Sequence, residues 1–402
     1  MKDPSRVRVE GPLEPFARGF GEQLVSQGYA RSSAVAQVQL MAHLSRWMAG
    51  EGVSVAELTP ARLEQFVGTR RAAGYRHFVS AWPLTRVVDH LVGCGAVPAP
   101  QPPSPGTPAE ELVERYRSYL VSERSLAAST ARGYVRVARL LLSRLSSTDG
   151  LDLGELTASE VSRFVLAECG RRSVGSAKNL VAALRSLLGF FFLEGLTTSP
   201  LAGAVPAVAP WRGARLPRAL EEKAAARLLS SCDRRTTAGR RDYAILVLLV
   251  RLGLRAGEVA ALELDDLDWR AGEVVIRGKG HCRERLPLPV DVGEAVAGYL
   301  RRGRPRVACR RLVLRVKPPI AGLTGDGVTR VVHAACRRAG LRPVGAHRLR
   351  HTVATESLRR GACLTEVGQL LRHRSAFSTA IYAKVDRVAL RGLARRWPGG
   401  VA

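Results

Sequence analysis

The segment from Ala346 to Lys384 contains the side-chain types that chemistry on a phosphate requires. His347 and Arg350 stand three positions apart, so a helix would place both on one face, where they could reach the same anion. His373 and Tyr382 follow in the same segment. The phenol of a tyrosine has an ordinary pKa of about 10, so it becomes a usable nucleophile only beside cations and a proton acceptor. These residues predict a site in which a tyrosine attacks an anionic centre.

Two segments further upstream supply more cations. Residues 249–262 carry Arg255 and Glu258, and residues 274–289 carry Lys279. Arginine pairs with two non-bridging phosphate oxygens at once and keeps its charge when it is buried, which lysine does less reliably. Combined with the histidines and the tyrosine downstream, these side chains suit a phosphodiester.

The spacing of apolar residues indicates the elements that would position these side chains. Residues 352–371 show helical spacing, and Gly361 divides them into two helices. Residues 274–276 are β-branched, Gly278 and Gly280 suit a turn, and leucines alternate on the way back. We therefore expect Lys279 at the tip of a β-hairpin.

The second half of the chain, about residues 215–395, resembles the tyrosine recombinases, the phage-integrase and Xer-like family. The resemblance is carried by six residues in the order and approximate spacing of that family: Arg255, Lys279, His347, Arg350, His373 and Tyr382. It implies a mainly α fold, in which helical N-terminal DNA-binding domains precede an α+β catalytic domain with a small antiparallel sheet.

The resemblance also implies a role for each of the six catalytic residues. Tyr382 would attack a DNA phosphorus, form a 3′-phosphotyrosyl bond and free a 5′-hydroxyl, so that resealing needs neither ATP nor a metal. Arg255 and Arg350 would hold the non-bridging oxygens and offset the charge of the transition state. Lys279 would protonate the departing 5′-oxygen.

The two histidines of the motif have implied roles as well. His347 would accept or relay the tyrosine proton, and His373 would hydrogen-bond the scissile phosphate. Glu258 stands where the family usually has an acid, and we interpret it as a partner of Arg255. Arg372 occupies the position of the family's glycine before His373, where it could add a phosphate contact or shift His373.

A zinc site is the alternative for His347 and His351, which are spaced i, i+4 as in a helical metal pair. Their motif is HRLRH, which lacks the glutamate of H-E-x-x-H and places two arginines between the histidines, where they would repel a cation. The seven cysteines are scattered without a C-x-x-C pair, so neither a disulfide framework nor a cysteine zinc site is indicated. We expect no cofactor and no metal.

The chain divides into domains at two segments rich in proline. The expected parts are an accessory arm-like helical domain, a linker, a core-binding SAM-like helical domain, a second linker and the catalytic domain, at residues 1–97, 98–108, 109–199, 200–217 and 218–402. Residues 57–67 (ELTPARLEQFV) resemble residues 155–165 (ELTASEVSRFV), which suggests a duplicated helical bundle. The first copy either contacts DNA or packs against its neighbour, and both alternatives remain open.

The net charge of +27 predicts a polyanionic partner. From Arg212 onward there are 39 Lys and Arg against 17 Asp and Glu, so the charge is concentrated around the candidate site. No apolar run approaches 18 residues and the N-terminus lacks an apolar core, so we expect a cytoplasmic protein without a membrane helix. The expected partner is double-stranded DNA, with no small-molecule substrate.

The sequence therefore predicts a site-specific tyrosine recombinase, or integrase, of a mobile genetic element, acting as a homo-tetramer on synapsed DNA. Apolar residues of the tail, within residues 386–402, would pack against a neighbouring subunit. The alternatives are a DNA-binding regulator without catalysis, a type IB topoisomerase and a metal-dependent nuclease. The target sequence of the DNA does not follow from these residues.

Overall fold

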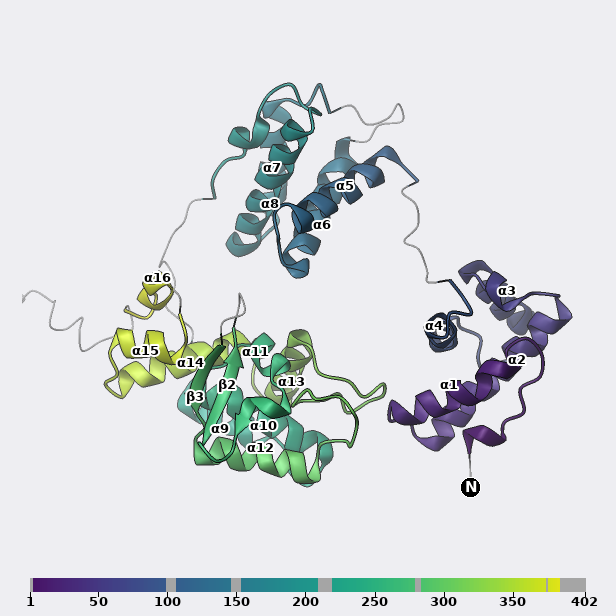
Figure 1. Cartoon of the computed structure of the whole chain (residues 1–402). Helices are drawn as coiled ribbons and strands as arrows, with labels where there is room; N and C mark the ends of the chain where they lie inside the picture. Colours follow the sequence, from purple (N-terminus) through teal and green to yellow (C-terminus); the bar gives the residue numbers. More distant parts are fainter. Residues whose placement is uncertain are drawn as a thin grey trace, which may run out of the picture. The chain divides into compact units, whose positions relative to one another are not determined.

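The computed structural model describes residues 3–98, 106–145, 153–208, 219–278, 283–373 and 375–383 (Figure 1). The chain divides into two compact units, one of residues 99–212 and the other of residues 1–98 together with 213–402. Several predictions fall outside the described residues: Lys279 and Gly280 of the expected turn, the tail from residue 384, and residues 99–105 and 209–217 of the two expected linkers.

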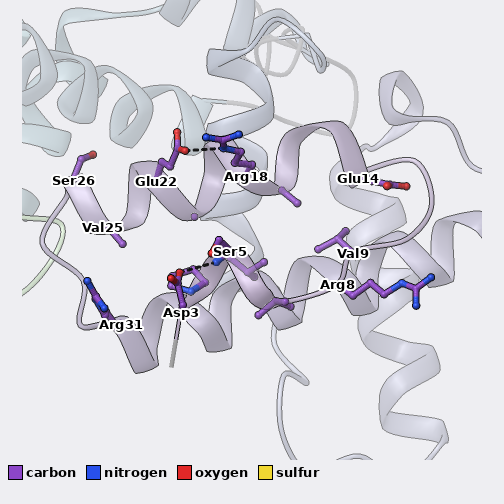
Figure 2. A pocket seen from close by; sticks show the side chains of 15 residues that line it. Asp3, Ser5, Arg8, Val9, Glu14, Arg18, Glu22, Val25, Ser26 and Arg31 are labelled. Carbon is purple, nitrogen blue, oxygen red and sulfur yellow. Dashed lines mark hydrogen bonds and ion pairs between the residues drawn. The ribbon is translucent and has the colours of Figure 1, made fainter. Parts of the chain in front are cut away.

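The first segment is helical, as expected. Its helices are α1 (Glu14–Ser26), α2 (Arg31–Gly50), α3 (Pro60–Ala72) and α4 (Thr85–Gly93), with short 3-10 turns η1 (Pro4–Arg6), η2 (Val55–Glu57) and η3 (Trp82–Leu84). They enclose a hydrophobic core of their own. A groove of about 860 Å³ lies along η1, α1 and α2, and Arg18 pairs with Glu22 on its wall (Figure 2).

The unit of residues 99–212 is a second helical bundle. It contains α5 (Pro108–Ser122), α6 (Ala128–Leu145), α7 (Ala158–Gly170), α8 (Val174–Leu193) and the turn η4 (Leu201–Ala204). Leu201 and Val205 belong to its core. The bundle therefore extends into residues 200–208, which the sequence assigned to the second linker.

The expectation of no membrane-length apolar helix needs correction at α8. Among the described residues, α8 is the one helix long and apolar enough to cross a membrane by length and composition. Counting uninterrupted apolar runs missed it because Lys178 and Arg185 interrupt the run. Half of its apolar window is buried in the bundle, where Leu184 and Phe191 are fully enclosed. This burial is typical of the central helix of a soluble bundle.

The two bundles share the local feature that suggested a duplication. Thr59 precedes α3 and its side chain accepts a hydrogen bond from the backbone N–H of Arg62. Thr157 precedes α7 and accepts in the same way from Glu160. A threonine at this position satisfies a backbone donor that the first helical turn leaves without a partner. The matching sequences thus begin matching helices.

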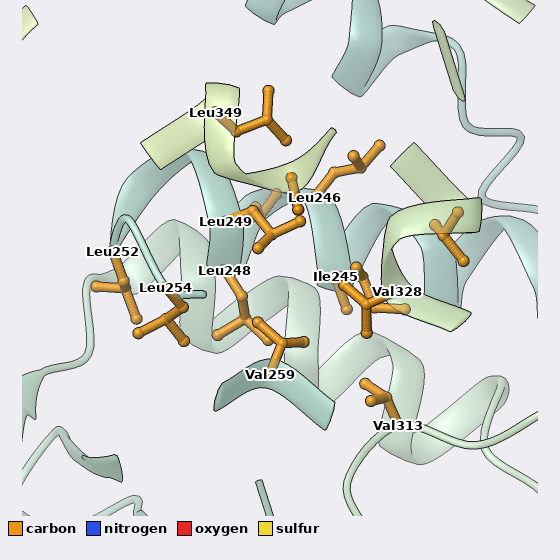
Figure 3. Packing of buried hydrophobic residues seen from close by; sticks show 14 of the residues in the cluster. Ile245, Leu246, Leu248, Leu249, Leu252, Leu254, Val259, Val313, Val328 and Leu349 are labelled. Carbon is orange, nitrogen blue, oxygen red and sulfur yellow. The ribbon is translucent and has the colours of Figure 1, made fainter. Parts of the chain in front are cut away.

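The helix α10 (Thr237–Arg251) packs against α9 (Glu222–Ser230), α11 (Ala256–Ala261), α12 (Val290–Arg302), α13 (Gly325–Arg338) and α14 (Ala346–Arg359). The next helix, α15 (Leu364–Leu370), packs against α14 and α16 (Ala376–Ala380). Leu246, Leu248 and Leu249 of α10 are fully buried, and Val259 of α11 and Leu349 of α14 pack in the same cluster (Figure 3). Burying a leucine side chain stabilises a fold by about 1.5–3 kcal/mol, so α10 anchors the surrounding helices.

A small antiparallel sheet confirms the predicted hairpin and, with the helices, the predicted fold class. Its strands are β1 (Leu267–Asp268), β2 (Glu273–Arg277) and β3 (Arg283–Pro287), in that order, and η5 (Leu264–Asp266) precedes them. Val274 pairs with Leu286, and both are buried. The side chains of β2 alternate between the core and the other face, as period-two spacing requires.

A second, smaller hydrophobic cluster joins α14 and α15 to the residues after α16. Its buried members are Val353, Ala354, Leu358, Val367, Leu371 and Tyr382. Gly361 ends α14 in the left-handed region at a φ of 95°, which confirms the predicted break between two helices. This cluster fixes Tyr382 beside α14.

Candidate active site

Arg350 lies at the centre of the candidate site. Its side chain is 1% exposed, and one guanidinium nitrogen donates to the carbonyl of Gly253 at 2.7 Å. A second nitrogen donates to the carbonyl of Leu371. Gly253 has a φ of 57°, and a Cβ there would lie 2.8 Å from Leu371 Cδ2, so only glycine fits this approach. Arg350 thereby joins two loops that are far apart in sequence.

Arg255 precedes α11 and is bound to Glu258 in two ways. Its backbone N–H donates to Glu258 Oε2 at 2.8 Å, and its guanidinium donates to Oε1 at 2.6 Å. Burial raises the pKa of Glu258, but hydrogen bonds from Arg255 and the charge of Arg372 outweigh it and hold that pKa below its ordinary value. Glu258 is therefore an ionised partner, while 45% of the Arg255 side chain remains exposed to a ligand.

Arg372 turns inward and binds Glu258. Its guanidinium donates to Glu258 Oε2 at 2.8 Å, and its side chain is only 4% exposed. The backbone of Arg372 has a φ of 54°, the left-handed conformation that explains why a glycine suits this position. The sequence left open a phosphate contact or a displaced His373. In the structure the side chain forms a buried ion pair with the acid of α11.

Tyr382 is buried, and its hydroxyl lies 2.7 Å from Nδ1 of His351. Burial raises the pKa of Tyr382 to about 12, and the positive charge of Arg350 opposes this rise. The phenol is therefore protonated near neutral pH. It needs a proton acceptor before it can attack.

His373 and His347 lie on either side of this pair. His373 Nδ1 is hydrogen-bonded to Thr379 Oγ1 at 2.8 Å, and its ring is stacked on Tyr382 with centroids 6.3 Å apart. Burial, followed by the charges of Arg350 and other nearby cations, lowers the pKa of His373 to about 4. The ring of His347 meets that of His351 edge to face, with centroids 4.5 Å apart, and partial desolvation and the charges of Arg350 and Arg255 lower the pKa of His347.

The electrostatics of the site favour an anion. Burial lowers the pKa of Arg350 to about 10, and the charge of Arg255 acts in the same direction. The same two guanidinium groups also depress the pKa values of His347 and His373. An anion bound among these groups would relieve the repulsion between them. Within the part of the chain that the structure describes, no group of three or more His, Cys, Asp or Glu could hold a metal.

The structure brings five of the six predicted residues into one region: Arg255, His347, Arg350, His373 and Tyr382. Lys279, the sixth, lies outside the described residues. Sequence reasoning missed the contact between His351 and Tyr382, although the HRLRH spacing already placed His351 one helical turn after His347 on the same face. It also missed the ion pair between Arg372 and Glu258, because the sequence does not show whether the long side chain of Arg372 points to the phosphate or to the protein interior.

Comparison with known proteins agrees with this arrangement. The sequence model of the Phage integrase family matches residues 218–388, and that of the Phage integrase, N-terminal SAM-like domain matches residues 113–195. The putative integrase/recombinase y4rA of Sinorhizobium fredii is 40% identical over 97% of this chain and 96% of its own length. Tyrosine recombinase XerD of Listeria monocytogenes is 29% identical over 71% of this chain and 98% of its own.

A solved structure shares the fold. The lambda integrase tetramer bound to a Holliday junction matches with a TM-score of 0.53 and 16% identity, over 82% of this chain and 90% of that one. The chain belongs to the phage integrase family of tyrosine recombinases. Site-specific recombination is the function that this membership supports.

Proposed function

We propose that this recombinase cleaves and rejoins double-stranded DNA through a covalent bond between Tyr382 and a 3′-phosphate. Arg255 and Arg350 bind the non-bridging oxygens of the scissile phosphate and stabilise the charge of the pentacoordinate transition state. Lys279 protonates the departing 5′-oxygen, and His373 hydrogen-bonds the phosphate. His347 lies against His351, the ring that contacts the Tyr382 hydroxyl, and from there it relays the tyrosine proton.

The observation that carries the proposal is the position of the Tyr382 hydroxyl. It is buried beside Arg350 and hydrogen-bonded to an imidazole, with a second imidazole stacked on its ring. A structural tyrosine needs one hydrogen-bond partner and no cation. A nucleophilic tyrosine needs cations to hold its target and an acceptor for its proton.

The proposed chemistry stores the energy of the broken phosphodiester in the phosphotyrosyl bond. The freed 5′-hydroxyl attacks that bond to restore the DNA, so no ATP is consumed. The charge of the transition state is balanced by guanidinium groups, which replace a metal ion in that role. Recombination proceeds in a homo-tetramer on synapsed DNA. The name of the lambda integrase structure gives a tetramer bound to a Holliday junction for that protein.

The separate helical bundles favour a different role for each part of the chain. Residues 109–199 bind the core site, residues 218–402 carry out catalysis, and residues 1–97 form an accessory domain that contacts DNA. The relative y4rA, whose name reads putative integrase/recombinase, matches almost the whole chain, which supports the integrase role. In this proposal the integrase belongs to a mobile genetic element and acts in the cytoplasm.

The test uses a DNA substrate with a nick next to the cleavage point, so that the covalent product cannot be resealed. Wild type and Tyr382→Phe are incubated with it in EDTA without ATP and run on a denaturing gel. We expect a protein–DNA adduct with wild type alone. An adduct with both proteins would remove Tyr382 as the nucleophile, and no adduct despite tight binding would favour a regulator without catalysis.

A second assay separates recombination from strand relaxation. A type IB topoisomerase would relax a supercoiled plasmid that lacks the recombination site. We expect relaxation only when the plasmid carries that site, because the proposed enzyme cleaves within an assembled complex.

A further inference from the structure

We infer that His351 is the proton acceptor of Tyr382 in the cleavage step and returns the proton when the strand is rejoined. This inference deepens the proposed function and rests on it, because it assigns a role at the same site. It starts from the 2.7 Å contact between His351 Nδ1 and the Tyr382 hydroxyl. That length is typical of a well-formed hydrogen bond to a hydroxyl, and it places donor and acceptor within reach for proton transfer.

The position of His351 is fixed by the elements around it. On α14 it directly follows Arg350, and the buried side chain of Arg350 is held by two backbone carbonyls. Tyr382 is held in the hydrophobic cluster of α14 and α15. Both partners are therefore positioned by the fold before DNA binds, which removes part of the entropy cost of aligning them.

The protonation states suit a transfer from oxygen to nitrogen. Burial, followed by the charges of His347, Arg350 and Arg348, lowers the pKa of His351 to about 4, so the ring is neutral near pH 7. Tyr382, with its raised pKa, is protonated at the same pH. A neutral ring that carries its proton on Nε2 leaves Nδ1 free to accept from the phenol.

The surroundings also explain how a ring with a low pKa can accept the proton. Among the described residues, the charged and titratable groups that face His351 are His347, Arg348 and Arg350 of its own helix and Tyr382, which follows α16. The DNA phosphate that the site binds adds a negative charge beside Arg350. That charge offsets the cations that depress the pKa of His351, so its basicity rises when substrate is present.

The step balances as follows. The phenolic oxygen forms a bond to phosphorus while its proton moves to His351 Nδ1, and the bond from phosphorus to the 5′-oxygen breaks. The 5′-oxygen takes its proton from Lys279 in the proposed mechanism. Rejoining reverses each transfer, so the enzyme ends the reaction with the protons it had at the start.

The test compares wild type with His351→Asn, which keeps a hydrogen-bond acceptor near the position of Nδ1 but cannot take up a proton. His333→Asn on α13 is the matched control. Equal DNA affinity and equal urea unfolding midpoints show that each variant folds, and His351→Gln replaces the asparagine variant if that one unfolds. We expect adduct formation to be about 10²-fold slower in His351→Asn and unchanged in His333→Asn.

Two further readouts distinguish proton acceptance from a merely structural role. Between about pH 7.5 and about pH 9 the wild-type rate should stay level, because His351 is neutral in this range even when the bound phosphate restores its ordinary pKa. The rate of His351→Asn should rise with pH, because its phenol must lose the proton to hydroxide. A substrate with sulfur in place of the 5′-bridging oxygen needs no protonation of its leaving group, so it should restore Lys279→Ala but not His351→Asn.

Two results would overturn the inference while leaving the proposed function intact. One is a wild-type rate and pH profile in His351→Asn. The other is a restored rate of adduct formation by His351→Asn with the sulfur substrate, which would mean that His351 acts on the leaving group. An adduct formed by Tyr382→Phe, or none with wild type, would instead count against the proposed function itself.

Discussion

Two buried arginines enclose the candidate site, and their hydrogen-bond partners differ in charge. Arg350 donates to the backbone carbonyls of Gly253 and Leu371, which are dipoles without net charge. Arg372 binds the carboxylate of Glu258. A guanidinium carries five N–H donors, more than two carbonyls accept, so Arg350 keeps both charge and donors for a phosphate. Arg372 serves to hold Glu258, and through it Arg255.

Replacing Arg372 with the family's glycine tests this division. Arg372→Gly removes one partner of a buried carboxylate, which costs about 1–3 kcal/mol, and relieves left-handed strain of about 1 kcal/mol. We expect a lower free energy of unfolding in urea and slower adduct formation, because Arg255 loses an anchor. Arg372→Ala should be less stable than the glycine variant by about 1 kcal/mol, since alanine keeps the strain. A glycine variant as stable and as active as wild type would contradict the argument.

The lowered pKa values of His351 and His373 predict how stability depends on pH. Burial is the first cause of both shifts, and both folded values are about 4, against about 6.5 in the unfolded chain. Between these values the unfolded chain binds protons that the folded chain does not. The free energy of unfolding should therefore decrease as the pH falls from about 6.5 towards about 4.

Urea unfolding at pH 7 and at pH 5 measures this effect. The double variant His351→Asn/His373→Asn should lose less stability than wild type between these two conditions, because neither asparagine takes up a proton. Equal losses in the two proteins would show that other groups control the acid response.

At the scale of elements, local patterns in the sequence predicted the helices and the hairpin, because these depend on residues that are close in sequence. The two helices divided at Gly361 and the hairpin around Val274 follow from apolar spacing and turn residues, and the structure contains both. The contact of His351 with Tyr382 could not be predicted, because it depends on how the residues after α16 fold back onto α14. The ion pair between Arg372 and Glu258 could not be predicted either, because it depends on how close α11 lies to Arg372 in the folded chain.

The turn at Gly253 shows how an element boundary controls the site. Gly253→Ala should destabilise the protein by about 1–2 kcal/mol from its φ alone, and the added Cβ would press on Leu371. Both carbonyls that hold Arg350 would move, so adduct formation should slow as well. Gly257→Ala in α11 is the control, since its Cβ would meet open space and alanine favours a helix by about 1 kcal/mol. Urea unfolding should show opposite shifts for the two variants, and a shift of the same sign would count against this account.

At the scale of the whole molecule, the additional helical bundle lies in the first half of the chain, while most of the positive charge lies in the second half. XerD of Listeria monocytogenes matches 71% of this chain over nearly all its own length, so more than a quarter of the chain has no counterpart there. Residues 1–98 hold 11 of the 62 basic residues against 8 of the 35 acidic ones, a net charge of +3. Residues 3–98 also have a core of their own. The additional bundle therefore brings little net charge to the DNA.

This distribution predicts the salt dependence of DNA binding. A protein that contacts six to ten phosphates loses about 10³- to 10⁵-fold in affinity between about 50 and about 200 mM salt. We expect a loss in that range for the full chain, with most of the slope retained after deletion of residues 1–98, because the basic half of the molecule is unchanged. Titration of one DNA fragment at several salt concentrations gives both slopes. If the deletion halved the slope, the arginines of the first bundle would have to contact phosphates despite its low net charge, and residues 1–97 would be a principal DNA-binding domain.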